Sequence, residues 1–268
     1  MKRIRFGDLC IDKGNYTLYA VRGADAGNVN KNEMVYIDTD GSTDRDIYFQ
    51  SRVIEVEGHL LADNITGYAK LKEILENACN PKITRDLYYF NGFKTYYAEA
   101  RADQLPAITP INYCNAKFIL YLKIEKFYWL SNNDINVNIF KREDKIKGTF
   151  QFPMIFTERT SKALVRNDGA TEGYPTFKIY LNDDQMEIEI KNNTSGQTLS
   201  LSVSMQQGET VTIDCEDKKI TSDTQGDLTK WMSKDSEFIS IAPGIEEIEC
   251  ISSGSSVICT YRNKYLGA

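Results

Sequence analysis

The sequence has little of the chemistry that most enzymes need. His59 is its only histidine, and its six cysteines include no CxxC pair. One histidine leaves no margin for a catalytic triad or a set of metal ligands, and zinc-finger spacing is missing. P-loop, dinucleotide-binding and HExxH motifs are missing as well. We interpret His59 as a surface or capping residue, and we predict no enzymatic activity, no bound metal and no cofactor.

An excess of basic charge is also lacking. Lys and Arg number 32 against 38 Asp and Glu, which gives a formal net charge of −6, and no basic run occurs. Proteins that bind nucleic acid through its phosphates usually carry a basic patch. The composition therefore argues against a nucleic-acid ligand.

Long apolar runs are absent too. Residues 118–122 form one of the longest such runs, which is far below the length that spans a bilayer. Met1-Lys2-Arg3 leads into a polar mixture rather than into the apolar core of a signal peptide. The sequence therefore predicts a soluble product of the cytoplasm with no membrane partner.

Two of the cysteines have a suggestive spacing. Cys250 and Cys259 flank a serine-rich turn at residues 252–255, so a hairpin would place them opposite each other and allow a disulfide. Because no secretion signal is seen, we favour two reduced cysteines that fill a core face.

The first half shows strand and helix patterns in turn. Ile54 and Val56 alternate with acidic residues, the period of a strand with one wet face, and Gly58 ends or bends that strand. Residues 64–80 then take a helical period. The residues on its apolar face are Tyr68, Leu71, Leu75 and Ala78, with Asn64 or Thr66 as the N-cap and Asn80-Pro81 as the stop.

A hairpin follows the helix. Asn91-Gly92 joins the strands expected at residues 86–90 and 93–100, and this pair suits a two-residue type I′ turn. A long strand over residues 115–129 closes the first half. The charged residues 141–145 are interpreted as a linker or its flank.

The second half shows short strands at the spacing of a β-sandwich. The alternating apolar sets are Phe177/Ile179/Leu181, Met186/Ile188/Ile190, Leu199/Leu201/Val203/Met205, Val211/Ile213 and Val257/Cys259/Tyr261. At 268 residues the chain exceeds the usual size of a single core, so we predict two domains, residues 1–135 and residues 136–268.

In this order, the features resemble the distal tail protein family of tailed bacteriophages, over nearly the whole chain. The residues that carry the resemblance are Arg45, residues 54–58, the single helix, Asn91-Gly92, Pro106, Asn167-Asp168-Gly169, Tyr174-Pro175, residues 192–196, residues 208–214, Phe238, Pro243-Gly244 and residues 261–267. Glu246 departs from the pattern, because the family commonly has Asn at that position after the Pro-Gly pair.

The resemblance implies a mainly β fold with one helix. It implies a split β-barrel-like α+β domain that forms a ring, followed by a galectin-like or carbohydrate-binding-module-like β-sandwich. The family's role implies a hexameric ring of this chain at the distal end of a virion tail, assembled in the bacterial cytoplasm. Its partners would be the tail-tube protein, a tail-tip or baseplate hub protein, and a receptor-binding protein or host glycan, and DNA would only pass through the lumen. We expect the first domain to form the ring without the second.

A lectin-like adhesion module that binds cell-surface glycans is the alternative hypothesis. Sugar sites use exposed aromatic rings, and Trp231, Tyr174 and Tyr180 are the candidates for contact with a glycan or partner. Core or interface packing is the competing interpretation of each ring.

Overall fold

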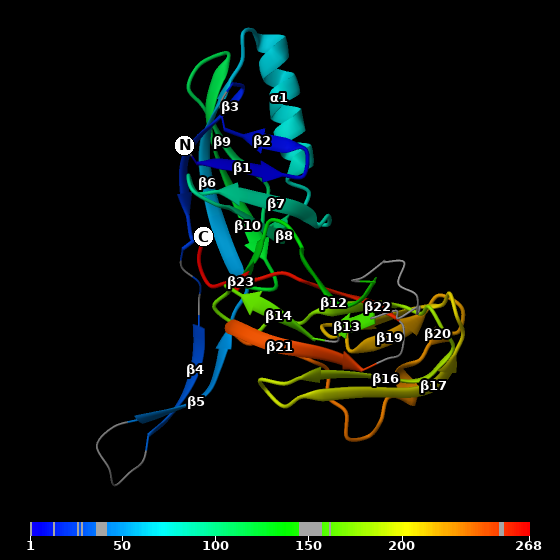
Figure 1. The fold of residues 1–268 in the computed structure, drawn as a ribbon. Coiled ribbons are helices and arrows are strands. Elements are labelled where there is room, and N and C mark those ends of the chain that lie inside the picture. The colour runs from blue at the N-terminus through cyan, green and yellow to red at the C-terminus, as the bar shows by residue number, and fades with distance from the viewer. Residues whose placement is uncertain are drawn as a thin grey trace. The chain divides into compact units, whose positions relative to one another are not determined.

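The chain folds into two compact units in the computed structural model, which describes residues 2–12, 14–25, 27, 29–35, 42–144, 157–160, 162–251 and 255–268. The first unit comprises Met1–Asn132 together with Tyr265–Ala268, and the second comprises Asn133–Lys264. Figure 1 shows that strands dominate both units and that α1 lies in the first. The predicted class, mainly β with one α-helix, is confirmed. The return of the last four residues to the first unit is a feature that the sequence prediction missed.

One antiparallel sheet organises the first unit, in the order β2-β1-β7-β8-β10-β6-β3. The elements of this unit are β1 (Arg3–Phe6), β2 (Leu9–Ile11), β3 (Tyr16–Arg22), β4 (Val29–Val35), β5 (Ser42–Phe49), β6 (Arg52–Leu61), α1 (Ile65–Ala78), β7 (Arg85–Phe90), β8 (Thr95–Ala102), β9 (Ala107–Pro110), β10 (Asn115–Ile124) and β11 (Trp129–Ser131). A two-residue strand, β23 (Lys264–Tyr265), pairs with β11. β4 and β5 form a separate hairpin that leaves the sheet between β3 and β6 (Figure 1). β2 and β3 meet at a bridge between Asp12 and Thr17, and within the described residues the sheet does not close into a barrel.

The core of the first unit lies between α1 and one face of this sheet. Side chains of β6, β8 and β10 alternate between buried and more exposed positions, as expected for strands with one covered face. Leu75 of α1 is fully buried, and Tyr68 and Leu71 pack against the same core. The Oδ1 atom of Asn64 accepts a hydrogen bond from the Gly67 amide at 2.7 Å, so the predicted N-cap is confirmed.

One expectation for the strands of this unit was wrong, and of the two roles expected for Gly58 one is excluded, because this residue does not end its strand. β6 continues through Gly58, which must be glycine because a Cβ atom there would lie 2.3 Å from the Phe118 ring. The strand expected over residues 115–129 ends at Ile124. The chain then turns through Phe127, at a φ of +59°, and Trp129 belongs to the separate strand β11.

The hairpin between β7 and β8 is confirmed, but its turn differs from the prediction. Phe90 pairs with Thr95, so the loop has four residues rather than two. The Oδ1 atom of Asn91 accepts hydrogen bonds from the amides of Phe93 and Lys94, each at 3.0 Å. The asparagine therefore acts through its side chain, as in an Asx-turn, and Gly92 supplies the positive φ.

Two sheets form the second unit, in the orders β13-β12-β22-β15-β18-β19-β20 and β14-β21-β16-β17. The elements are β12 (Ile135–Asp144), β13 (Thr157–Thr160), β14 (Lys162–Asn167), β15 (Thr176–Tyr180), β16 (Gln185–Asn192), β17 (Thr198–Met205), β18 (Thr210–Asp214), β19 (Lys219–Ser222), β20 (Gly226–Asp227), the 3₁₀ turn η1 (Thr229–Trp231), β21 (Gly244–Ile251) and β22 (Ser256–Tyr261). Aliphatic side chains from both sheets make one core, including Val165, Phe177, Ile190 and Ile248.

Two details of the second unit differ from the sequence predictions. Residues 141–144 continue β12 and pair with β13, so they are not a linker; Lys145 lies outside the described residues. Met186 is 73% exposed, because a bulge near the start of β16 turns it away from the core.

The cysteines Cys250 and Cys259 do not face each other across a hairpin. They lie on β21 and β22, which belong to different sheets, and both are buried free thiols. Residues 252–254 of the expected turn lie outside the described residues. The favoured interpretation, two reduced cysteines that fill the core, agrees with this arrangement.

Candidate functional site

The three predicted contact aromatics are exposed but do not converge. Tyr174 precedes β15, Tyr180 ends it, and Trp231 ends η1; their exposed fractions are 39%, 41% and 48%. Tyr174 and Tyr180 lie six residues apart along extended chain, which corresponds to about 20 Å. A single glycan ring therefore cannot touch both tyrosines.

Tyr174 lines a pocket of about 410 Å³ in the second unit. Its lining residues are Glu172, Tyr174, Gln197, Cys215, Lys218, Met232, Ser236, Glu237, Phe238 and Ser240. Trp231 and Tyr180 are not part of the lining. The sequence prediction found one residue of this pocket, because exposure of an aromatic is a local signal whereas the pocket is assembled from four loops.

Backbone hydrogen bonds hold these loops together. The amide of Gly173 donates to the Ile241 carbonyl at 2.9 Å, and the amide of Ile241 donates back at 2.8 Å. The amide of Cys215 donates to the Pro175 carbonyl at 3.1 Å. The segments before β15, after β18 and before β21 are thus fixed to one another on either side of Tyr174.

Some polar groups that line the pocket have hydrogen-bond partners within the chain, and others have none among the described residues. The Oε1 atom of Gln197 accepts from the amide and hydroxyl of Ser240, at 3.0 and 3.3 Å. Within the described part of the chain, the carboxylates of Glu172 and Glu237 and the ammonium of Lys218 make neither a hydrogen bond nor an ion pair. These three groups are available to a ligand.

A second candidate surface lies on the uncovered face of the first unit's sheet. We call it the Arg–Tyr face and define it as Arg3, Arg5, Tyr88, Phe90 and Tyr97. Arg3 lies 5.0 Å from the Phe90 ring centroid and Arg5 lies 4.2 Å from that of Tyr88. The rings of Tyr88 and Tyr97 pack at 5.2 Å. Arg and Tyr are the residues that protein–protein interfaces enrich.

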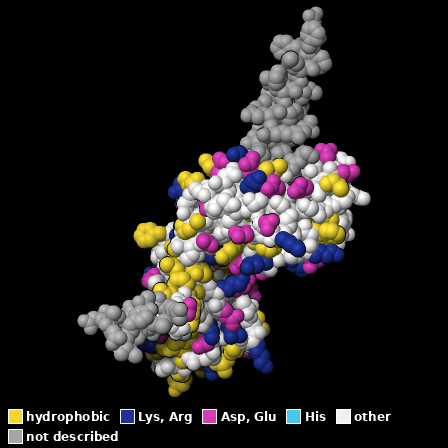
Figure 2. Space-filling view, turned by 90° about the horizontal axis from the view of Figure 1, so that it is seen from below, with side chains coloured by type: hydrophobic (Ala, Val, Ile, Leu, Met, Phe, Trp, Pro, Cys, Tyr) yellow, Lys and Arg dark blue, Asp and Glu magenta, His cyan; other side chains and the backbone are white. Residues whose placement is uncertain are grey.

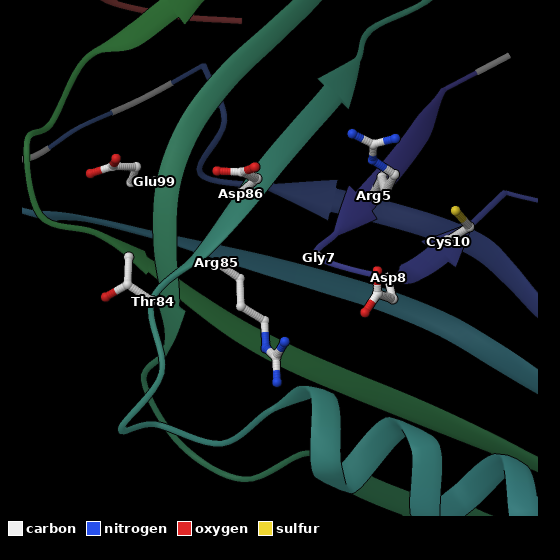
Figure 3. A pocket seen from close by; sticks show the side chains of 8 residues that line it. All are labelled: Arg5, Gly7, Asp8, Cys10, Thr84, Arg85, Asp86 and Glu99. Atoms are coloured by element: carbon white, nitrogen blue, oxygen red, sulfur yellow. The ribbon is translucent and has the colours of Figure 1, made fainter.

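An open depression adjoins the Arg–Tyr face (Figure 3). Arg5, Asp86 and Glu99 project into it from β1, β7 and β8, and Asp86 and Glu99 are directly opposite in the register. The hydroxyl of Tyr97 donates to Asp86 at 3.0 Å. The Arg85 side chain is directed toward the helix, where its Nε atom donates to the Ala78 carbonyl at 3.1 Å. The depression therefore presents mixed charge.

A buried cation in the first unit was missed by the sequence analysis. Arg52, the first residue of β6, is 1% exposed and donates to the carbonyls of Ala24, at 2.6 Å, and Leu266. Its guanidinium lies 4.6 Å from the centroid of the Phe127 ring. Burial lowers the pKa of Arg52, and the nearby charge of Asp25 opposes this shift.

Other side chains from distant segments contact the Ala24 carbonyl or the end of the chain. The Nε1 atom of Trp129 donates to the same Ala24 carbonyl at 3.0 Å. Tyr265 packs edge-on against Tyr96 at 5.5 Å, and the Lys94 ammonium lies 3.8 Å from the Tyr265 ring centroid. Alternation along β6 places Arg52 inside, but charge normally argues against burial, so the sequence pattern alone could not assign it. Arg52 fixes the last residues of the chain to the first unit.

The described ranges contain neither a candidate membrane-spanning helix nor a candidate metal cluster. No helix there is long and apolar enough to cross a membrane. No cluster of His, Cys, Asp and Glu with the geometry of a metal site occurs in the same part of the chain.

Comparison with known protein families gives a match to the second unit. Residues 168–265 match the siphovirus-type tail component, C-terminal domain. The resemblance to the distal tail protein family is confirmed. Comparison with curated protein sequences finds no match.

Solved structures extend the likeness of this distal tail protein fold to both units. The crystal structure of the phage SPP1 Dit (gp 19.1) protein, described as a paradigm of hub adsorption apparatus in phages that infect Gram-positive hosts, aligns with a TM-score of 0.78 and 11% identity. The alignment covers 99% of this chain and 100% of that chain. A chain of the phage P2 baseplate in its activated conformation with Ca aligns with a TM-score of 0.56 and 11% identity over the full length of both chains. At this identity the alignments establish the fold of both units, and the family match covers the second unit.

Proposed function

We propose that this chain is a distal tail hub: a hexameric ring that joins the tail tube to the tail tip or baseplate. The carrying observation is the similarity of fold to SPP1 Dit across 99% of the chain, which includes both units. In this proposal the first unit builds the ring. The second unit is displayed at the periphery, where receptor-binding components attach. Assembly takes place in the bacterial cytoplasm.

The surface chemistry of the first unit supports self-association. Its sheet leaves one face uncovered within the described residues, and the Arg–Tyr face lies there. A ring needs a heterologous interface, in which one patch on a protomer meets a different patch on the next. Paired Arg and Tyr side chains with adjacent carboxylates provide such a patch with both apolar contact and directional polar contact.

The charge of the chain agrees with a DNA conduit. The formal net charge is −6, and acidic and basic side chains are interspersed over the surface that Figure 2 presents. A lumen without a basic excess does not retain phosphates. DNA would then pass through the ring without being bound by it.

Light scattering and electron microscopy of the purified full chain test the proposal. We expect a ring of six chain masses, either alone or after addition of its tail-tube partner. Replacing Tyr88 and Tyr97 together by Ala should dissociate the ring, whereas Tyr180→Ala, which removes an exposed aromatic ring from the second unit, should leave it intact. Monomers of the unaltered chain under both conditions would contradict a hub.

A fragment that tests ring formation by the first unit must contain residues 265–268 as well as residues 1–132. A chain truncated near Asn138 lacks Tyr265–Ala268 and leaves Arg52 without its Leu266 acceptor. We therefore expect ring formation by the first unit from residues 1–132 joined through a short Gly/Ser linker to residues 265–268. The same fragment without residues 265–268 is the matched control and should associate poorly.

The lectin-like alternative retains one favourable observation, the pocket beside Tyr174. A monomer that binds sugar and never forms rings would favour this alternative over the hub. A hub with a sugar-binding second unit is compatible with both sets of observations.

A further inference from the structure

We propose that the pocket beside Tyr174 is a binding site for one pyranose ring of an uncharged glycan. The site lies wholly within the second unit and does not depend on ring formation. Its volume of about 410 Å³ falls in the range of small-ligand pockets, roughly 300–1,000 Å³.

One wall of the pocket matches the apolar face of a sugar. Tyr174, Met232 and Phe238 contribute an aromatic ring, a thioether and a second aromatic ring. Aromatic rings offer large apolar area with little conformational freedom to lose, and a pyranose presents a patch of C–H groups to them. Lys264 lies 4.7 Å from the centroid of the Tyr174 ring and so helps to fix its orientation.

The polar lining residues of the pocket match the hydroxyl groups of a sugar. Glu172 and Glu237 supply carboxylate acceptors, and Lys218 supplies an ammonium donor. None of the three groups has a hydrogen-bond or ion-pair partner within the described residues. Ser236 and Ser240 add hydroxyl groups, and Gln197 adds an amide. Vicinal hydroxyls can donate to a carboxylate and accept from an ammonium at the same time, so this set of groups suits a polyol.

The balance of charge selects against anionic ligands. Among the lining residues two carboxylates stand against one ammonium. A phosphate or a carboxylated sugar would place further negative charge beside Glu172 and Glu237, which like-charge repulsion disfavours. We therefore assign the pocket to neutral hexoses or N-acetylhexosamines.

The pocket is already formed without a ligand. The paired hydrogen bonds between Gly173 and Ile241 fix one side. On the other side, the Oδ1 atom of Asp214 accepts from the amides of Glu216 and Asp217 at 2.9 and 3.0 Å, and this turn leads to Lys218 at a φ of +53°. A non-glycine residue in this conformation is uncommon, and such residues cluster at ligand sites. Pre-formed loops reduce the entropy lost on binding.

Saturation-transfer NMR on the full chain tests the site with four probes: methyl galactoside, methyl glucoside, N-acetylglucosamine and N-acetylgalactosamine. We expect at least one probe to bind in the millimolar range. Tyr174→Ala should abolish the signal, while Tyr180→Ala, at the far end of the strand β15 that follows Tyr174, should preserve it. Glu237→Gln changes an exposed side chain and should weaken binding at least three-fold without a change in unfolding temperature.

Three results would overturn the proposal. The first is no transfer from any probe to the unaltered chain at high millimolar concentration. The second is equal loss of binding in Tyr174→Ala and Tyr180→Ala. The third is tighter binding of N-acetylneuraminic acid or inorganic phosphate than of the neutral sugars. Ring formation is measured separately, so a failure here leaves the hub proposal standing.

Discussion

The two units of this chain enclose their cores in different ways. The second unit places its core between two sheets, and side chains of both sheets fill it. The first unit covers one face of a single sheet with α1 and leaves the other face uncovered within the described residues. A sandwich is complete by itself, whereas an open sheet retains a surface for neighbours. This difference supports the proposal that the first unit assembles and the second is displayed.

The buried charges of the two units also differ in kind. The first unit buries a cation, Arg52, against backbone carbonyls that include one from the end of the chain. The second unit buries two carboxylates within local networks. Glu209 accepts from Ser222 and from the Gln206 amide, and Glu246 accepts from Asn192 at 2.9 Å. The buried charge of the first unit thus binds backbone carbonyls, one of them 214 positions away, whereas the buried carboxylates of the second unit bind side chains and amides 3 to 54 positions away.

The largest expected effect comes from removing the buried cation. Arg52→Ala should lower the free energy of unfolding of the first unit by about 4 kcal/mol, because it leaves a cavity beside Phe127 and removes the donor to the Leu266 carbonyl. Arg22→Ala is the matched control: Arg22 is an exposed arginine on the neighbouring strand, paired with Glu55 and Glu57, and its loss should change stability by less than about 0.5 kcal/mol. Calorimetry of both variants checks this. Equal effects would mean that the contacts of Arg52, including the bond to Leu266, do not stabilise the first unit.

A smaller loss is expected from the helix that covers the sheet. Leu75→Ala should cost about 3 kcal/mol, because Leu75 is fully buried between α1 and the sheet. Ile74→Ala, one position away and 51% exposed, should cost less than about 0.5 kcal/mol. Chemical denaturation of the two variants measures the contrast. Similar values for both would show that the α1 interface contributes little to the unit.

Acid should affect the second unit selectively. Burial raises the pKa of Glu209, but hydrogen bonds from Ser222, the Gln206 amide and Gln225 outweigh it, and the pKa lies below its ordinary value. A carboxyl whose folded pKa is depressed contributes stability above its unfolded pKa, about 4.3, and loses it as the pH falls through the folded pKa.

The test of this pH dependence uses Glu209→Gln. The variant should unfold more easily at pH 7 by about 2 kcal/mol, and its stability should depend less on pH between 7 and 3 than that of the unaltered chain. Two-transition calorimetry over this range reports on each unit separately. An unchanged pH slope in the variant would remove Glu209 as the cause.

Local signals in the sequence predicted the local structure well. The helix at residues 64–80, observed as Ile65–Ala78, and the hairpin around Asn91-Gly92 depend on capping, periodicity and turn chemistry, which neighbouring residues determine. The exposure of Tyr174, Tyr180 and Trp231 agrees with the prediction of contact aromatics, although it tests no ligand.

Features that depend on distant contacts escaped prediction. The bond from Arg52 to Leu266 joins residues that are 214 positions apart, and no periodicity carries that information. The bulge that exposes Met186 depends on the pairing of β16 with β17, so alternation alone placed this side chain in the core. The pocket beside Tyr174 escaped for the same reason, because its walls come from segments that only the folded sandwich brings together.

The smallest predicted effect concerns the start of α1. Asn64→Ala should lower the stability of the first unit by about 1 kcal/mol, because the Gly67 amide loses the side-chain oxygen to which it donates at 2.7 Å. Asn64→Asp keeps an acceptor in the same place, adds a charge that favours a helix N-terminus, and should be at least as stable as the unaltered chain. Urea denaturation can resolve a difference of this size. If Asn64→Ala proved neutral, the packing of Leu75 rather than the cap would define where α1 begins, and the helix would owe its stability almost entirely to the sheet beneath it.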